Sequence, residues 1–419
     1  SDPSLSAHKA RLDIRKPRLW SPDRPELYRL VLSLNEDTPG ADFLQADLGF
    51  RKFEIRGKEI FLNNQPFLIK GVNRHDHDPE LGKTIRPELL ELDARLMKQL
   101  NINFVRNSHH PMDIRWYLIA NRFGLALIDE GNVETHNFYD LFPANRQHWF
   151  APCQDRVRSM VVRARNLPSV MIWSPGNEFT DRFTQSVAVM QETARAFDPS
   201  RPFMAEYRGK RPALEKGFFA GTPDFISPMY GGIGLMKAVV ELQRETRPFF
   251  FCEYSHAFGN SMGSFMEMWN LIREHEQLNG GCIWDWADQN IYLPDAEIQY
   301  LADGSELGGR MSKDSGNADG IVSADRRLNP ETDIVKHAYQ DVQFVSFDSD
   351  TYTLKLKNEF IDSDLSSFEF VYEITEDGVV EGEGALNNIQ LAPGQTRDFR
   401  IHLPERSGFK GETMIRFAA

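Results

Sequence analysis

Two glutamates each stand at the end of an apolar run that is typical of a buried strand. Glu178 ends the run that begins at Val170, and Glu253 ends the run that begins at Pro248. In a barrel of parallel strands the reactive side chains lie at the carboxyl ends of the strands, so both carboxylates would face one cavity. Glycoside hydrolysis uses such a pair, because one carboxylic acid protonates the departing oxygen while one carboxylate attacks the sugar or activates water.

Each glutamate by itself is better explained as a rim residue that caps a helix or pairs with an arginine. The two together favour catalysis. Asn177 precedes one and aromatic residues surround the other, so their environments can separate the two pKa values. We therefore predict Glu178 as the acid/base and Glu253 as the nucleophile. A separation of about 5 Å between their carboxyl groups would retain the configuration of the sugar.

Other side chains near the predicted strand ends are suited to bind the substrate. Asn177 is suited to hold a sugar hydroxyl, while Arg106 and Tyr230 are suited to orient the nucleophile, although rim hydrogen bonds explain all three about as well. Neutral imidazoles can donate to substrate hydroxyls or to the transition state, and this role fits His75, His109 and His256. A flat indole can carry a sugar ring, which fits Trp284, whereas barrel core explains Trp173 and Trp286 better.

A metal site is indicated by Glu134 and His136, which lie two residues apart and point the same way in an extended segment. With Glu178 nearby, this donor set suits Mg²⁺ or Mn²⁺ better than a structural zinc ion. A lone Glu-x-His pair is weak evidence. The pair His75 and His77 would open a metal-dependent amidohydrolase site, but no histidine follows the fifth or sixth predicted strand.

Apolar runs that alternate with amphipathic segments must position these residues. The predicted strands cover residues 67–73, 103–108, 125–131, 170–174, 202–206, 224–229, 248–253 and 281–286. The predicted helices cover residues 87–100, 112–123, 154–165, 183–197, 235–245 and 264–277, and the first carries Leu89, Leu92, Leu96 and Leu100 at helical spacing. Eight such units predict an α/β fold, a (β/α)₈ TIM barrel over residues 57–336.

Short strand patterns flank the barrel. Residues 1–56 predict part of an immunoglobulin-like β-sandwich, with strands at 11–16, 26–33 and 45–55. Residues 337–419 predict a second β-sandwich, expected to be incomplete, with strands at 342–347, 352–357, 368–374, 396–403 and 413–417. Unpaired strand edges in such partial sandwiches favour a homo-oligomer.

Composition excludes several classes of partner. Among 419 residues, 48 Lys and Arg face 61 Asp and Glu, a net charge of −13, which argues against nucleic acid or an anionic membrane. No apolar stretch approaches the roughly 18 residues of a membrane span. The three scattered cysteines form no disulfide framework, so a reducing, cytoplasmic location is expected. The chain begins with Ser rather than Met, which suggests that an upstream segment was removed.

Six blocks of sequence together resemble glycoside hydrolase family 2, and within it the large bacterial-type β-galactosidases. They are GVNRHDHDP (71–79), FVRNSHHP (104–111), IDEGNVETH (128–136), WSPGNE (173–178), CEYSHAFGNS (252–261) and WDWADQ (284–289). The resemblance implies a retaining double displacement with Glu178 as acid/base and Glu253 as nucleophile. It also implies Mg²⁺ on Glu134, His136 and Glu178, and substrate contacts from His75, His109, Asn177, Tyr230, His256 and Trp284.

The sequence departs from this family at several points. Pro175, Phe179 and Phe258 replace the usual Leu, Ser and Met of their motifs. The family's Na⁺ ligands correspond to Gly316 and Asp319, so the residues do not favour a sodium ion. The family's N-terminal jelly roll and large C-terminal domain have no counterpart here, and a fragment or shortened homologue is expected.

Three functions remain open from the sequence. The favoured one is hydrolysis of terminal, lactose-type β-D-galactosides. Another β-glycosidase of the family, such as a β-glucuronidase, is a second hypothesis, and a non-catalytic carbohydrate-binding fragment is a third. A panel of glycosides would distinguish the three.

Overall fold

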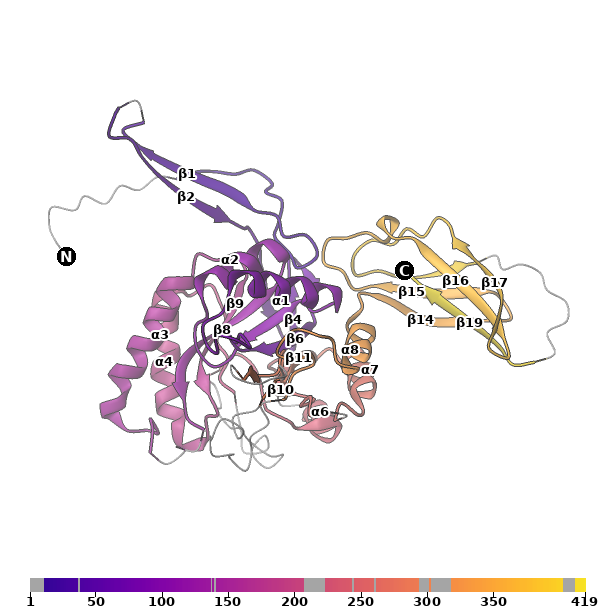
Figure 1. Cartoon of the computed structure of the whole chain (residues 1–419). Helices are drawn as coiled ribbons and strands as arrows, with labels where there is room; N and C mark the ends of the chain where they lie inside the picture. The colour runs from indigo at the N-terminus through magenta and orange to yellow at the C-terminus, as the bar shows by residue number, and fades with distance from the viewer. Residues whose placement is uncertain are drawn as a thin grey trace.

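The computed structural model describes residues 11–36, 38–136, 138, 141–206, 223–242, 245–259, 261–293, 301–302, 318–401 and 411–419. A barrel wrapped by helices occupies the centre (Figure 1). A two-stranded ribbon projects from it on one side, and a β-sandwich lies on the other. Among the described residues, no helix is both long enough and apolar enough to cross a membrane.

Parallel strands build the barrel wall. Six of them form one sheet in the order β10-β11-β6-β7-β8-β9. Their bounds are Ile69–Arg74 (β6), Phe104–Asn107 (β7), Ala126–Glu134 (β8), Val170–Asn177 (β9), Phe249–Tyr254 (β10) and Leu278–Ile283 (β11). All six strands are almost wholly buried, as expected for a parallel sheet covered on both faces, although polar residues make up half of β6 and of β7.

The gap between β9 and β10 is closed by the segments predicted as the fifth and sixth strands. Each is reduced to isolated parallel bridges, from Trp173 to Phe203 and from Ile226 to Phe249. The amide of Asp224 donates to the carbonyl of Phe203 at 2.9 Å and joins the two segments to each other. The predicted eight-stranded (β/α)₈ barrel is therefore confirmed, with two of its strands very short.

Helices surround this wall. They are Pro87–Gln99 (α1), Ile114–Phe123 (α2), Phe150–Ala164 (α3), Thr184–Phe197 (α4), Gly232–Glu241 (α6), Phe265–Glu274 (α7) and Glu331–Tyr339 (α8), with 3₁₀ turns at Gln147–Trp149 (η1) and Asp181–Phe183 (η2). One apolar cluster lies between the wall and the helices, and a second fills the barrel interior. Successive residues of β10 contribute to the two clusters alternately: Phe249 and Phe251 belong to the outer cluster, and Phe250 and Cys252 belong to the inner one.

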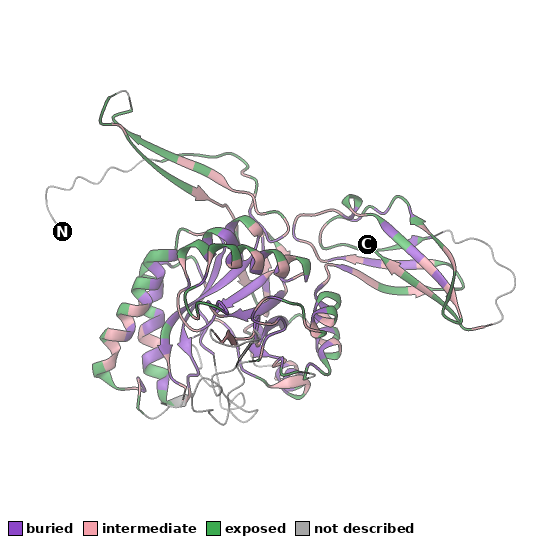
Figure 2. Cartoon of the chain, viewed as in Figure 1, coloured by how far each residue is buried: buried purple, intermediate pink, exposed green. Residues whose placement is uncertain are grey.

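The segment before the barrel contains less structure than predicted. Tyr28–Leu34 (β1) and Asp42–Leu48 (β2) pair as an antiparallel ribbon that is mostly exposed (Figure 2). Phe53–Arg56 (β3), Glu59–Leu62 (β4) and Gln65–Pro66 (β5) form a separate three-stranded sheet. The predicted strand at 11–16 is wrong, because those residues form no strand, and the one at 45–55 is divided between β2 and β3.

The second sandwich contains two three-stranded sheets around its own apolar core. One sheet has Val342–Asp348 (β14), Thr353–Asn358 (β15) and Thr396–Arg400 (β18); the other has Val379–Leu386 (β17), Phe370–Glu376 (β16) and Thr413–Ala418 (β19), with a 3₁₀ turn at Leu365–Ser367 (η3). The sequence analysis missed β17.

Helix α8 crosses the boundary that was predicted between residues 336 and 337. The helix still packs on the barrel, since the hydroxyl of Tyr339 donates to the carbonyl of Gly71 in β6 at 2.9 Å. A short pair, Ile291–Tyr292 (β12) with Leu301–Ala302 (β13), follows β11.

Candidate active site

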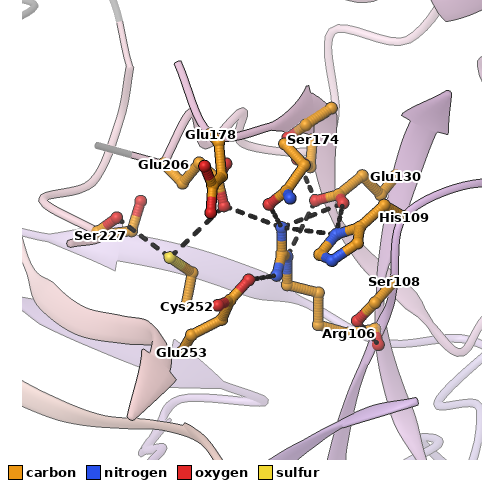
Figure 3. A network of polar contacts seen from close by, with 12 residues as sticks. Arg106, Ser108, His109, Glu130, Ser174, Glu178, Glu206, Ser227, Cys252 and Glu253 are labelled. Atoms are coloured by element: carbon orange, nitrogen blue, oxygen red, sulfur yellow. Dashed lines mark hydrogen bonds and ion pairs between the residues drawn. The ribbon is translucent and has the colours of Figure 1, made fainter. Parts of the chain in front are cut away.

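A cluster of buried polar side chains lies at the carboxyl ends of the barrel strands, centred on Arg106 of β7 (Figure 3). The guanidinium contacts Glu130 through two bonds of 2.8 and 3.0 Å, and it donates to Glu206 at 2.8 Å and to Glu253 at 2.7 Å. Burial acts to lower the pKa of Arg106, but these three carboxylates outweigh it and raise that pKa well above its ordinary value. Arg106 is therefore permanently charged. It connects its own strand, β7, to carboxylates on three other strands of the barrel: β8, the fifth predicted strand and β10.

Glu253, the predicted nucleophile, is held on both of its oxygens. Its Oε1 accepts from Arg106, and its Oε2 accepts from the hydroxyl of Tyr230 at 2.7 Å. The residue is only 3% exposed. Burial raises the pKa of its carboxyl to about 7, with a further rise from the charge of Glu178, while Arg106 and Tyr230 oppose the rise. The sequence predicted Arg106 and Tyr230 as the residues that orient Glu253, and both contact it.

Glu178, the predicted acid/base, follows the last residue of β9 and is 7% exposed. Its φ of +59° turns the chain sharply at the barrel rim. The preceding Asn177 accepts from Arg106 at 3.0 Å, so one guanidinium contacts both Glu253 and the neighbour of Glu178. The two predicted catalytic carboxyl groups therefore lie at the same end of the barrel, Glu253 bonded to Arg106 and Glu178 next to a residue that Arg106 also contacts.

A wall of aromatic rings and imidazoles stands beside this cluster. The rings of His109 and Trp284 stack at 5.2 Å, and His75 meets both edge-on at 5.5 and 5.3 Å. Burial, together with Lys83 and other cations, lowers the pKa of His75 to about 3, and burial with Arg106 lowers the pKa of His109 well below its usual value. Both rings are therefore neutral at physiological pH, as the sequence predicted, and can donate or accept a hydrogen bond.

A second row of rings leads away from Glu253. The ring of Tyr230 lies 5.6 Å from that of His256, which stacks on Phe258 at 5.2 Å. Tyr230 and Phe258 are about half exposed. Asp319 connects this row to the first wall, since its Oδ2 accepts from the indole of Trp284 at 3.3 Å and lies 3.9 Å from Nε2 of His256. Five of the residues predicted to bind the substrate thus form two groups of rings beside the carboxylates. One group contains His75, His109 and Trp284, and the other contains Tyr230 and His256.

The predicted metal ligands are neighbours without forming a metal-binding group. Nδ1 of His136 lies 3.3 Å from Glu178, and both oxygens of Glu134 accept from the amide of Asn177, at 3.3 and 3.0 Å. The backbone amide of His136 also donates to Glu134 at 2.8 Å. Over the part of the chain that the structure describes, no group of three or more His, Cys, Asp or Glu side chains could hold a metal ion. Mg²⁺ on Glu134, His136 and Glu178 therefore stays a prediction.

Two residues correspond to the family's sodium ligands. Asp319 is engaged with Trp284, and Gly316 lies outside the described residues.

Several residues of the cluster were missed by the sequence analysis. Glu130 stands inside the block IDEGNVETH, and Glu206 ends the fifth predicted strand, so the strand-end rule that selected Glu178 would have selected both. Asn73 accepts from Arg106 at 2.9 Å and donates to three carbonyl oxygens of β10 and β11. Asp285 lies 3.2 Å from His75, and burial raises the pKa of its carboxyl to about 8. Asn73 ends the first predicted strand, so the same rule would have selected it as well.

Comparisons with known proteins agree with this architecture. The model of the TIM barrel domain of glycosyl hydrolases family 2 matches residues 53–344, and a second model of glycosyl hydrolases family 2 matches residues 2–51. A β-galactosidase of Pectobacterium atrosepticum is 34% identical over 93% of this chain and 38% of its own length. One from Vibrio vulnificus is 35% identical over 92% of this chain and 38% of its own length. The chain therefore spans less than half of the relatives that it matches.

Solved structures show the same fold at lower identity. A family 2 β-galacturonidase of Eisenbergiella tayi superposes with a TM-score of 0.63 at 22% identity, covering 79% of this chain and 61% of that one. Such a likeness concerns the fold alone. The family models, the relatives above 30% identity and the barrel with its carboxylates agree: this chain belongs to glycoside hydrolase family 2.

Proposed function

We propose that the chain carries the active site of a retaining β-galactosidase. The observation that carries the proposal is the pair Glu178 and Glu253, which stand at the ends of β9 and β10 near one cation. Arg106 donates to Glu253 and to Asn177, the neighbour of Glu178. A pair of carboxyl groups at one barrel end is what glycoside hydrolysis requires. Galactosides are favoured as the substrate class because the relatives at 34 and 35% identity are β-galactosidases.

In the first step an oxygen of Glu253 attacks the anomeric carbon, and the bond from that carbon to the leaving oxygen breaks. Glu178 gives its proton to the leaving oxygen, so the alcohol departs neutral. Tyr230 and Arg106 each donate to one oxygen of Glu253 and hold it for attack. The product of this step is a glycosyl ester on Glu253 with inverted configuration.

In the second step Glu178, now a carboxylate, takes a proton from water. The resulting oxygen attacks the anomeric carbon, the ester bond to Glu253 breaks, and the second inversion restores the original configuration. Neutral His75 and His109 are suited to bind sugar hydroxyls, since neither has to lose a proton first. The face of Trp284 that is not covered by His109 is suited to the apolar side of the sugar ring.

The test is an assay of the purified chain on a panel of aryl glycosides: β-galactoside, β-glucuronide, β-galacturonide and β-glucoside. We expect the galactoside to be cleaved with retention, read by NMR of the first anomer released, and Glu253→Gln to reduce turnover by at least about 10³-fold. The exposed helix residue Glu192, changed to Gln, is the matched control. Preference for a uronide would identify a uronidase, and sugar binding without cleavage would identify a carbohydrate-binding fragment.

The same assay, repeated with chelator and then with added Mg²⁺, examines the predicted magnesium ion. A rate that falls on chelation and recovers with Mg²⁺ would support the prediction. A rate that does not change would remove it.

A further inference from the structure

Three buried carboxyl groups share one positive charge. Glu130, Glu206 and Glu253 all accept from the guanidinium of Arg106, and the four side chains are between 0 and 4% exposed. If all three carboxyl groups were ionised, the group would carry a net charge of −2 in a medium that solvates charge poorly. Burying uncompensated charge is costly, and a carboxyl group in that position takes up a proton instead. One member of the group is therefore expected to be neutral.

The hydrogen bonds indicate which member holds the proton. Glu130 accepts two bonds from Arg106 and one of 2.7 Å from Ser174, and His109 lies 2.9 Å from its Oε1. Glu253 accepts one strong bond on each oxygen. A carboxylate with more donors is better stabilised in its charged form. Glu130 and Glu253 are thus both equipped to stay ionised.

Glu206 has the fewest donors of the three. Its Oε2 accepts from Arg106 at 2.8 Å and faces the Cys252 thiol at 3.7 Å, a weak donor. Its Oε1 is buried and has no hydrogen-bond partner among the described residues. An ionised carboxylate with one bare oxygen in the barrel interior would be the most costly of the three to keep charged.

We propose that Glu206 is a positioning residue that carries a proton in the resting enzyme. As a neutral acid it still accepts the hydrogen bond from Arg106 through Oε2 and so holds the guanidinium in place. The positive charge of Arg106 is then balanced by Glu130 and Glu253 alone. This inference rests on the proposed function for its meaning in catalysis. A charged Glu206 would compete for Arg106 and repel the negative charge of Glu253, so the nucleophile would be protonated more often. The neutral form avoids this repulsion and so favours the ionised form of Glu253.

Burial and most of the charged groups that face Glu206 also favour its protonated form. Burial raises the pKa of Glu206 well above its ordinary value; Arg106 of β7 opposes this rise, while Glu130 of β8, Glu253 of β10 and Glu178 beyond β9 add to it. The remaining titratable neighbour, Cys252 of β10, is a neutral thiol, because burial together with Glu206, Glu253 and Glu130 raises its pKa well above the usual range. Arg106 is thus the single cation among these neighbours.

The first test observes the proton directly and does not depend on activity. Infrared difference spectra of the whole chain, recorded for the unmodified protein against Glu206→Gln at neutral pH, should show the loss of one carbonyl band of a protonated carboxylic acid. The control difference against Glu192→Gln should show the loss of an ionised carboxylate instead. Loss of a carboxylate band in Glu206→Gln as well would overturn the proposal.

The second test measures how Glu206 affects the nucleophile. An activated 2-deoxy-2-fluoro-β-galactoside labels the nucleophile covalently, and the pH dependence of labelling, between about pH 5 and pH 9, reports its ionisation. In Glu206→Gln we expect the midpoint to stay within about 0.3 units of the unmodified chain, since an amide is also neutral. In Glu206→Ala we expect labelling to slow by at least about tenfold, because Arg106 loses an anchor that the Gln variant restores.

Two outcomes of this test contradict the proposal. A midpoint in Glu206→Gln lower by about one unit or more would mean that a negative charge had been removed. Unchanged labelling in Glu206→Ala would mean that the residue positions nothing. If the Ala variant does not fold, as judged by its melting curve, the Gln midpoint and the infrared band decide. Failure of the unmodified chain to be labelled at all would instead contradict the proposed galactosidase, and the infrared result would still stand.

Discussion

At the scale of single residues, the environment of Glu253 determines the pH range in which its carboxylate can act as the nucleophile. Burial raises its pKa to about 7, and its two donors, Arg106 and Tyr230, limit that rise. The ordinary pKa of an unperturbed glutamate is about 4.3, so the site keeps its nucleophile close to the point of half ionisation at neutral pH. Catalysis that needs the carboxylate should therefore lose rate as the pH falls below about 7.

The variant Tyr230→Phe tests whether a hydrogen-bond donor limits the rise in the pKa of Glu253. The Tyr230 hydroxyl stabilises the ionised form of Glu253, so its removal raises the pKa of the nucleophile and moves the acid limb of kcat/KM toward higher pH. One hydrogen bond to a carboxylate corresponds to a shift of about one unit. The measurement is the pH profile of aryl galactoside hydrolysis, with the exposed Tyr352, changed to Phe, as control. An acid limb at its original position would show that the bond does not set the pKa.

At the scale of elements, the end of β9 shows how the backbone places a catalytic side chain. Gly176 has a φ of +156°, and a Cβ atom at this position would lie 2.1 Å from the carbonyl oxygen of Val133 in β8. Only glycine allows β8 and β9 to approach so closely. The next two residues are Asn177 and Glu178, so this close approach fixes where the predicted acid/base emerges from the barrel.

Gly176→Ala should therefore affect both the fold and the site. We expect a loss of at least about 2 kcal/mol in the free energy of unfolding, because backbone on β8 has to move. We also expect kcat/KM to fall by about 10²-fold or more, since a displacement near 1 Å can cost that much. Chemical denaturation and initial rates are the measurements. Gly234→Ala in α6 is the matched control, because nothing lies within 4 Å of the added Cβ; equal effects in both variants would refute the argument.

At the scale of the whole molecule, a buried charge network joins the barrel to the second sandwich. Lys70 of β6, 1% exposed, lies 2.6 Å from Asp341 and 3.4 Å from Glu359, and Arg273 of α7 lies 3.2 Å from Glu359. Burial alone would raise the pKa of Glu359, but Lys70, Arg273 and Lys357 lower it to about 2. A cavity of about 530 Å³ lies beside this network, at the start of the strands and away from the candidate site.

Glu359→Ala leaves Lys70 buried with one carboxylate and Arg273 with none of its present acid contacts. We expect the free energy of unfolding at neutral pH to fall by about 3 kcal/mol, with little change in kcat/KM. The pKa of Glu359 is lower in the folded state, so its contribution is present above about pH 4.5 and is lost as the pH falls toward 2. Urea unfolding at about pH 7 and pH 3 should therefore show a smaller difference at pH 3. The exposed Glu369, changed to Ala, is the control.

The sequence by itself determined the barrel and the carboxylates that its strands present. Alternating apolar runs and amphipathic helices are local patterns, and the rule that reactive groups stand at strand ends turns them into a site. Local patterns failed where tertiary contacts decide. In helix α1 the predicted leucine face does pack against the core, with Leu100 buried and Leu89 and Leu96 partly buried. The same helix also buries Asp93, which pairs with Arg74 and Arg326, and no local pattern indicated that.

Only the tertiary structure decided which charges meet. Arg106 contacts Glu130, Glu206 and Glu253, which are 24, 100 and 147 residues away along the chain. Such pairings depend on how far each strand is shifted against the next when the barrel closes, and no periodicity of the sequence encodes that shift. The sequence therefore identified the two predicted catalytic acids, whereas the closed barrel determined how one guanidinium is shared among Glu130, Glu206 and Glu253 and which of them is left with a bare oxygen.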